Sequence, residues 1–130
     1  MPWGCWQAEA KKHPVAFNPK NLGPNINTTK LEYFPYLTPD GRLLSFTRLD
    51  GREENLYVSQ RIDSTFTQAV SFGSVINTED NEGAESMNAD GTLLFFTACN
   101  RPDGYGSCDI YFSQKSNNSW TQPNGIGKPV

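Results

Sequence analysis

The sequence predicts an all-β fold built from two copies of one four-stranded unit. The first observation is a repeat: residues 40–47 recur at 90–97, at an offset of 50, with the same Asp-Gly turn and apolar run. The second is a repeat of residues 55–61 at 109–115, at an offset of 54. The third is composition, since an aromatic content of 12% suits a sheet protein. A period near 50 residues in a strand-rich chain is typical of repeat arrays.

The first copy places turn residues between short β-prone runs. Asp40 and Gly41 follow a proline and form a turn, because proline presets φ and glycine accepts a positive φ. We expect Asp40 to cap this turn with its own side chain. Asp63 begins a second turn after a run of alternating polarity. The strands expected in this copy cover residues 33–38, 42–48, 55–61 and 66–70.

The second copy follows the same order. Asp90 and Gly91 take the turn positions, with Ala89 in place of the proline. Four additional residues fall between Thr97 and Asp109, so the loop after the second strand is longer here. The strands expected in this copy cover residues 85–88, 92–98, 108–115 and 120–122.

Tandem four-stranded antiparallel units describe the blades of a β-propeller. The aligned ends divide the chain into an N-terminal extension (1–14), the end of a preceding blade with its connector (15–28), blade one (29–73), and blade two with the start of the next connector (74–130). Two blades do not close a ring, which takes about four to eight. We therefore expect either a piece of a larger propeller or a subunit that closes the ring by oligomerisation. Phe66 and Trp120 are expected in the core between blades.

Four segments share the pattern of one known repeat, namely residues 21–28, 34–41, 103–111 and 120–124. With these segments the chain resembles the Pro-Asp-Gly, WD-like β-propeller repeat family, of the TolB type and of Bacteroidetes-type outer-membrane-associated proteins. The resemblance covers residues 15–130 and implies a TolB-like propeller that serves mainly as a binding platform. It also implies a periplasmic or outer-membrane-associated location, beside further blades of a parent protein.

Composition and charge limit the partners. A net charge of −3 and a pI near 5.0 argue against nucleic acid or an anionic membrane surface. No stretch reaches the roughly 18 apolar residues of a membrane span. Residues 1–7 lack the features of a signal peptide, so the signal of an exported protein is expected outside this chain.

Two of the three cysteines bracket the long loop of the second copy. The ends of an antiparallel hairpin hold two Cβ atoms within disulfide range, so Cys99 and Cys108 predict a bridge and an oxidising compartment such as the periplasm. The alternative is two free thiols. Cys5 is left over near the N-terminus, and the three cysteines do not form a zinc pattern.

A polar rim is the candidate ligand site. In this strand order, the connectors between units and the loops between second and third strands share one edge. Tyr105, between two glycines, and Arg101 suit a sugar or peptide ligand through stacking and bidentate contacts. The alternative is that Tyr105 packs on its own loop. The candidate binding residues are Asn77, Glu79, Glu82, Glu85, Asn100, Arg101, Asp103 and Tyr105.

The acidic residues of this rim raise two further possibilities. Their oxygens could hold Ca²⁺, but residues 79–83 do not follow the spacing of a calcium loop, so we expect a solvated acidic loop and no cofactor. Glu82 or Glu85 with Asp103 could form a carboxylate pair for sugar hydrolysis. No nucleophile–base arrangement is visible, since His13 lies outside the repeats, and no catalytic residue is assigned.

Three functions remain open at this stage. The first is a non-catalytic module that binds a protein or glycan of a bacterial cell envelope. The second is an enzyme, either a glycoside hydrolase or a peptidase-associated propeller. The third is a two-bladed lectin subunit that trimerises into a six-bladed ring.

Overall fold

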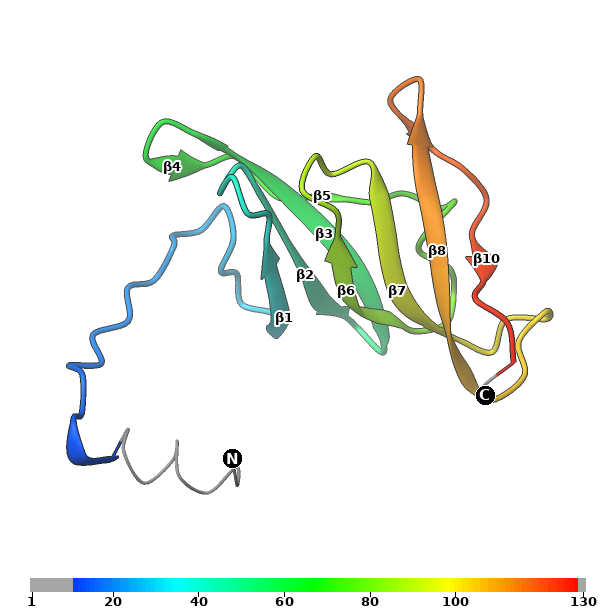
Figure 1. Cartoon of the computed structure of the whole chain (residues 1–130), viewed down its shortest axis with the longest axis horizontal. Coiled ribbons are helices and arrows are strands. Elements are labelled where there is room, and N and C mark those ends of the chain that lie inside the picture. The colour runs from blue at the N-terminus through cyan, green and yellow to red at the C-terminus, as the bar shows by residue number, and fades with distance from the viewer. Residues whose placement is uncertain (1–10, 129–130) are drawn as a thin grey trace.

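The computed structural model describes residues 11–128, whose strands form two antiparallel sheets (Figure 1). The first sheet contains β1 (Glu32–Leu37), β2 (Leu43–Asp50), β3 (Glu53–Ile62), β4 (Thr65–Phe66) and β5 (Val70–Ser71). The second contains β6 (Glu82–Met87), β7 (Leu93–Cys99), β8 (Cys108–Ser116), β9 (Ser119–Trp120) and β10 (Asn124–Gly125). The predicted all-β organisation in two antiparallel units is confirmed. Most of the expected N-terminal extension, including Cys5, lies outside the described residues.

The outer strand of each unit is broken, and its expected single run is wrong. In the first sheet, β4 pairs with the end of β3 and β5 pairs with its middle. Between these two strands, Thr67 accepts hydrogen bonds from β3 in place of the regular ladder. Ser59 Oγ donates to Thr67 O, and Gln60 N donates to Thr67 Oγ1. Thr121 does the same for Ser113 and Gln114 in the second sheet. The break is therefore built into the repeat.

The inner strands β1 and β6 each carry a bulge at the same place. Their register shifts between Tyr33 and Tyr36 in one and between Gly83 and Ser86 in the other. Within these bulges, Phe34 and Ala84 have φ values of 50° and 51°. An extra residue of this kind breaks the alternation of side chains along a strand. This explains why β6 begins at Glu82, earlier than the pattern predicts.

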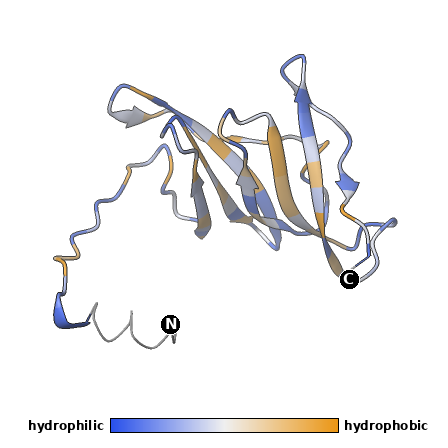
Figure 2. Cartoon of the chain, viewed as in Figure 1, coloured by the Kyte–Doolittle hydropathy of each residue, from blue (hydrophilic) through white to orange (hydrophobic). Residues whose placement is uncertain are grey.

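The two sheets pack face to face on a shared apolar core. The first sheet contributes Leu56 and the second contributes Leu94, Phe96 and Tyr111, all nearly inaccessible to solvent. β7 is hydrophobic along most of its length (Figure 2), and its residues Leu94, Phe96 and Ala98 are buried in this core. Trp120 joins this core as expected, and its ring lies against Phe72 with centroids 5.6 Å apart.

The opposite face of the first sheet carries a second apolar cluster. Ile26, Leu44, Phe46 and Ala69 are buried there, and Phe66 packs against them. Phe66 thus lies in a core, but not between the two sheets of this chain. Within residues 11–128, no helix is long and apolar enough to cross a membrane.

The Asp-Gly turns have the same hydrogen bonds in both units. Asp40 Oδ1 accepts from the backbone amide of Arg42, and Asp90 Oδ1 accepts from that of Thr92. Gly41 and Gly91 follow with φ values of 71° and 69°, which favour glycine. Both aspartates therefore cap their own turns.

Candidate functional site

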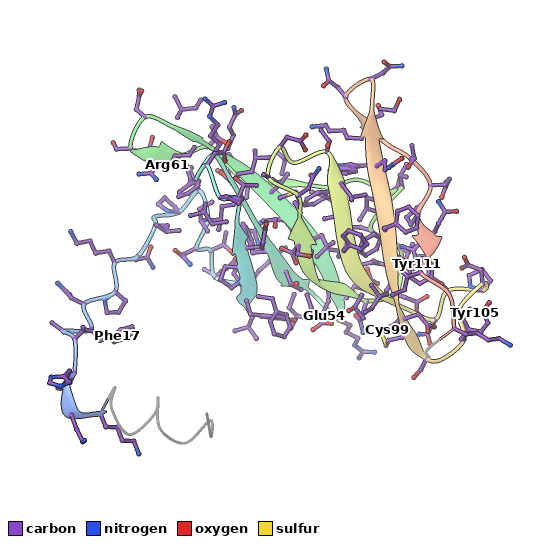
Figure 3. The ribbon with its side chains drawn as sticks, in the orientation of Figure 1. Phe17, Glu54, Arg61, Cys99, Tyr105 and Tyr111 are labelled. Atoms are coloured by element: carbon purple, nitrogen blue, oxygen red, sulfur yellow. A yellow bond between two sulfur atoms is a disulfide. The ribbon has the colours of Figure 1, made fainter. Side chains whose placement is uncertain are left out.

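The long loop of the second unit forms one end of the rim, and a disulfide closes its base. Cys99 and Cys108 are directly paired across β7 and β8, and their sulfurs are bonded. This confirms the predicted bridge. In Figure 3, Cys99 and Tyr105 lie at the same end of the second sheet, and Tyr111 lies further along β8.

Hydrogen bonds fix the loop from inside. The backbone amides of Tyr105 and Gly106 both donate to Asp109 Oδ2 at 2.9 Å. A Cβ at Gly104 would lie 2.7 Å from the same carboxylate oxygen, so a glycine is needed where the loop approaches Asp109. The disulfide and the Asp109 carboxylate together hold one conformation of the loop.

Tyr105 presents its ring to solvent at the tip of this fixed loop. The residue is 59% exposed, so the alternative, in which Tyr105 packs on its own loop, does not hold. Lys128 Nζ lies 5.6 Å from the ring centroid, within range of a cation–π contact. The Tyr105 ring of the loop and the Lys128 ammonium group of the C-terminal segment therefore lie next to each other.

Arg101 is turned inward, which corrects its predicted role as a ligand contact. Its guanidinium donates to Ile76 O at 2.6 Å and to Glu82 Oε1 at 3.1 Å. It also lies over the ring of Tyr111, 5.7 Å from the centroid. Because the Arg101 side chain is only 14% exposed, its charge is used within the protein.

The first unit builds the same arrangement around Arg48. Its guanidinium donates to Glu32 Oε1 at 2.9 Å and to Ile26 O at 3.0 Å, and lies 4.3 Å from the ring centroid of Tyr57. The Tyr57 hydroxyl donates to Asp50, as that of Tyr111 donates to Asp103 in the second unit. The arginine, the carboxylate, the carbonyl and the tyrosine thus recur as a set.

The repeat pattern did not predict the correspondence of Arg48 and Arg101, because the two arginines do not align at the offset of 50 or of 54. Arg48 and Arg101 are 53 residues apart, within the segments Arg-x-Asp-Gly at 48–51 and 101–104. In the strand register Arg48 matches Ala98, so the additional residues of the second unit lie in the loop 100–107, from which Arg101 reaches the same environment. The repeated Arg-x-Asp-Gly segment was the signal that could have revealed it.

Asp103 and Tyr111 belong to this structural set. Tyr111 is 1% exposed, and burial, followed by the hydrogen bond to Asp103, raises its pKa to about 12. The Tyr111 phenol stays protonated and donates at every physiological pH. One Asp103 oxygen is therefore engaged, although the residue itself lies on the exposed loop.

Three other predicted binding residues are buried. Glu82 is 0% exposed and accepts hydrogen bonds from the backbone and hydroxyl of Thr78 at 2.8 and 2.7 Å. Asn77 binds the backbone amide and carbonyl of Leu56 on the neighbouring sheet. Glu85 is 6% exposed, between the sheets. The expected solvated acidic loop and the carboxylate pair with Asp103 are wrong for both glutamates, because the second sheet packs them inward.

Glu85 is a buried carboxyl at the seam between the sheets. Burial raises the pKa of Glu85 to about 7, and the neighbouring hydroxyls of Ser45 and Thr47 offset only part of this rise. Thr47 Oγ1 lies 3.5 Å from Glu85 Oε2, whereas Glu85 Oε1 and Ser45 Oγ are buried without a satisfied partner. A proton on Oε1 would donate to the Ser45 hydroxyl and satisfy both atoms.

The rim that remains accessible is smaller than predicted. Asn100 donates to Asp80 Oδ1 at 2.9 Å and links the loop to the connector between the sheets. No three His, Cys, Asp or Glu side chains gather as a possible metal site within the described part of the chain. The exposed candidates are Glu79, Asn100, Asp103 and Tyr105.

Comparisons with known proteins do not assign the chain to a family. A scan against protein families found no match to the chain, and a search of curated proteins found none either.

Proposed function

We propose that the chain forms two blades of a Pro-Asp-Gly-type β-propeller and acts as a non-catalytic binding module of a bacterial cell envelope. Its ligand is a protein or a glycan of the envelope, bound at the rim. The repeated sequence segments and the face-to-face packing of two like sheets support the architecture.

The fixed loop around Tyr105 is the observation that carries the binding function. Ordering a surface loop costs conformational entropy, and here the ordered tip is left exposed instead of being buried. A ligand that binds this preformed surface loses little of its binding free energy to ordering the loop. The aromatic face of Tyr105 and the ammonium group of Lys128 suit the ring face and hydroxyls of a sugar, or a peptide side chain.

The disulfide supports the proposed location. Bridges such as Cys99–Cys108 persist in oxidising compartments, of which the bacterial periplasm is one. This supports a periplasmic or outer-membrane-associated protein.

The geometry gives no comparable support for a glycoside hydrolase. Glu82 is fully buried in an ion pair with Arg101, and Glu85 is enclosed between the sheets. A general acid or nucleophile must reach the scissile bond, which neither carboxyl does in this arrangement.

The test is a binding screen against envelope glycans, including soluble peptidoglycan fragments, with purified envelope proteins as a second arm. For the ligand found, Tyr105→Ala is expected to weaken binding about tenfold or more, while Tyr105→Phe keeps most of it. Phe17→Ala is the matched control, because Phe17 is also an exposed aromatic residue. Equal binding by wild type and Tyr105→Ala, or hydrolysis of the glycan, would contradict the proposal.

A further inference from the structure

Each of the two sheets has one face that is exposed in the described part of the chain. The equivalent face of the other sheet is buried where the two sheets meet. We call the face of the first sheet that bears Leu44 and Phe46 its front, and the corresponding face of the second sheet, with Leu94 and Phe96, its front. The back faces are the opposite ones. Within the chain, the back of the first sheet, with Leu56, packs on the front of the second. Within residues 11–128, no sheet packs on the front of the first sheet or on the back of the second.

The front of the first sheet is apolar and grooved. A groove of about 450 Å³ is lined by Ile26, Leu44 and Phe46, and another of about 530 Å³ lies beside it along Leu37 and Leu44. Leu37 is 47% exposed, yet its repeat equivalent, Met87, is 4% exposed in the core between the sheets. Among residues 11–128, no second sheet covers Leu37 as the first sheet covers Met87.

The back of the second sheet is the complementary surface. Ile110 is 49% exposed and Phe95 is 38% exposed, with the Phe95 ring packed against Phe112. The repeat equivalent of Ile110 is Leu56, which is 0% exposed because the second sheet covers it. The back of the second sheet is thus at least as apolar as the back face already buried inside the chain.

We propose that the back of the second sheet of one copy docks on the front of the first sheet of another copy, repeating the junction within the chain. The junction within the chain identifies a second copy as the partner, because there a back face of this kind already packs on a front face of this kind. Such a head-to-tail contact is heterologous, and it gives a closed ring when the rotation per sheet divides a full turn. Two to four copies would supply about four to eight sheets. This surface is separate from the Tyr105 rim.

The last part of the N-terminal segment lies on the front of the first sheet. Residues 11–18 are exposed and extend away from both sheets (Figure 1), whereas residues 19–22 line the groove beside Leu44 and Phe46. Residues 20–23 and 124–127 hold the same position in the repeat, since Gly23 and Gly127 share a positive φ with Gly73. The 124–127 segment of the docking copy is therefore expected to displace residues 20–23 from the edge of the groove.

Paired variants test the contact by sedimentation velocity. Leu37→Asp disables the front face and Ile110→Asp disables the back face, so each variant alone is expected to sediment as a 14.5 kDa monomer. Mixed in equal amounts, they retain one intact front and one intact back, and should form a complex of two chains. The unmodified chain is expected to form a discrete larger species.

Ile62→Glu is the control, because Ile62 is 54% exposed and lies on the β3–β4 hairpin. It is expected to keep the mass of the unmodified chain. Circular dichroism checks folding, and Leu37→Ala and Ile110→Ala replace a variant that fails to fold. A monomeric unmodified chain, a mixture that stays monomeric, or equal disruption by Ile62→Glu would overturn the proposal.

Discussion

In both units a buried arginine makes the same contacts, although the two arginines extend from different elements of the repeat. Arg48 extends from β2, whereas Arg101 extends from the long loop, yet each binds a glutamate, a backbone carbonyl and the face of a tyrosine. Burying a charge is costly unless the charge is paired, and each guanidinium here is paired with a glutamate. The repeat therefore preserves the environment of the guanidinium more strictly than its sequence position.

Arg101→Ala should lower the free energy of unfolding by about 3 kcal/mol, because it leaves Glu82 buried without its cation. Chemical denaturation measures the loss. Adding Glu82→Gln to Arg101→Ala should restore part of it. Arg42→Ala is the control, since the Arg42 side chain is 77% exposed and its loss should cost little. Equal effects of Arg101→Ala and Arg42→Ala would show that the buried pair is unimportant.

Glu85 should make stability depend on pH between its unfolded and folded pKa values. Because the folded pKa is raised from 4.5 to about 7, the folded state holds a proton that the unfolded state releases. This contribution is fully present below pH 4.5, is lost as the pH rises toward 7, and amounts to something on the order of 3 kcal/mol.

Glu85→Gln removes this titration, since an amide stays neutral. Thermal unfolding should show the variant gaining stability over wild type as the pH rises from 4.5 to above 7. A difference that does not vary with pH would mean that Glu85 does not titrate in this window.

At the level of elements, the long loop is stabilised at its base and at its centre. Cys99 and Cys108 join the strand ends, and Asp109 binds two amides of the tip. Closing a loop of about ten residues removes unfolded-state entropy. Order in the loop is thus supplied locally, without cover from another element.

Replacing both cysteines by serine should cost about 2 to 3 kcal/mol of stability. The amides of Tyr105 and Gly106 should also exchange faster with solvent, since the loop loses its closed base. Ser107→Ala, within the same loop, is the control and should leave both properties unchanged. Unaltered amide exchange in the double variant would show that Asp109 alone orders the loop.

For the whole molecule, the sequence predicted the unit and its long strands, because β-prone runs and Asp-Gly turns are local signals. The broken outer strands were not predicted, since Thr67 and Thr121 replace ladder bonds with side-chain contacts. The burial of Glu82 was missed because it depends on a partner 19 residues away. A repeated Thr-x-x-x-Glu segment at 28–32 and 78–82 was nevertheless visible in the sequence.

The packing of one unit on the next could not be predicted residue by residue. Offsets of 50 and 54 hid the equivalence of Arg48 and Arg101, and the rim then appeared richer in accessible charge than it is. Once Arg101, Glu82 and Asn77 are assigned to the interior, Tyr105 remains as the main exposed feature of the loop.

The most direct test of the account is the solution mass of the unmodified chain, measured by light scattering over a wide range of concentration. Two open, complementary faces predict one discrete oligomer of two to four copies, whose mass is a whole multiple of 14.5 kDa. A chain that stays monomeric at every concentration would contradict the head-to-tail complementarity of its two units.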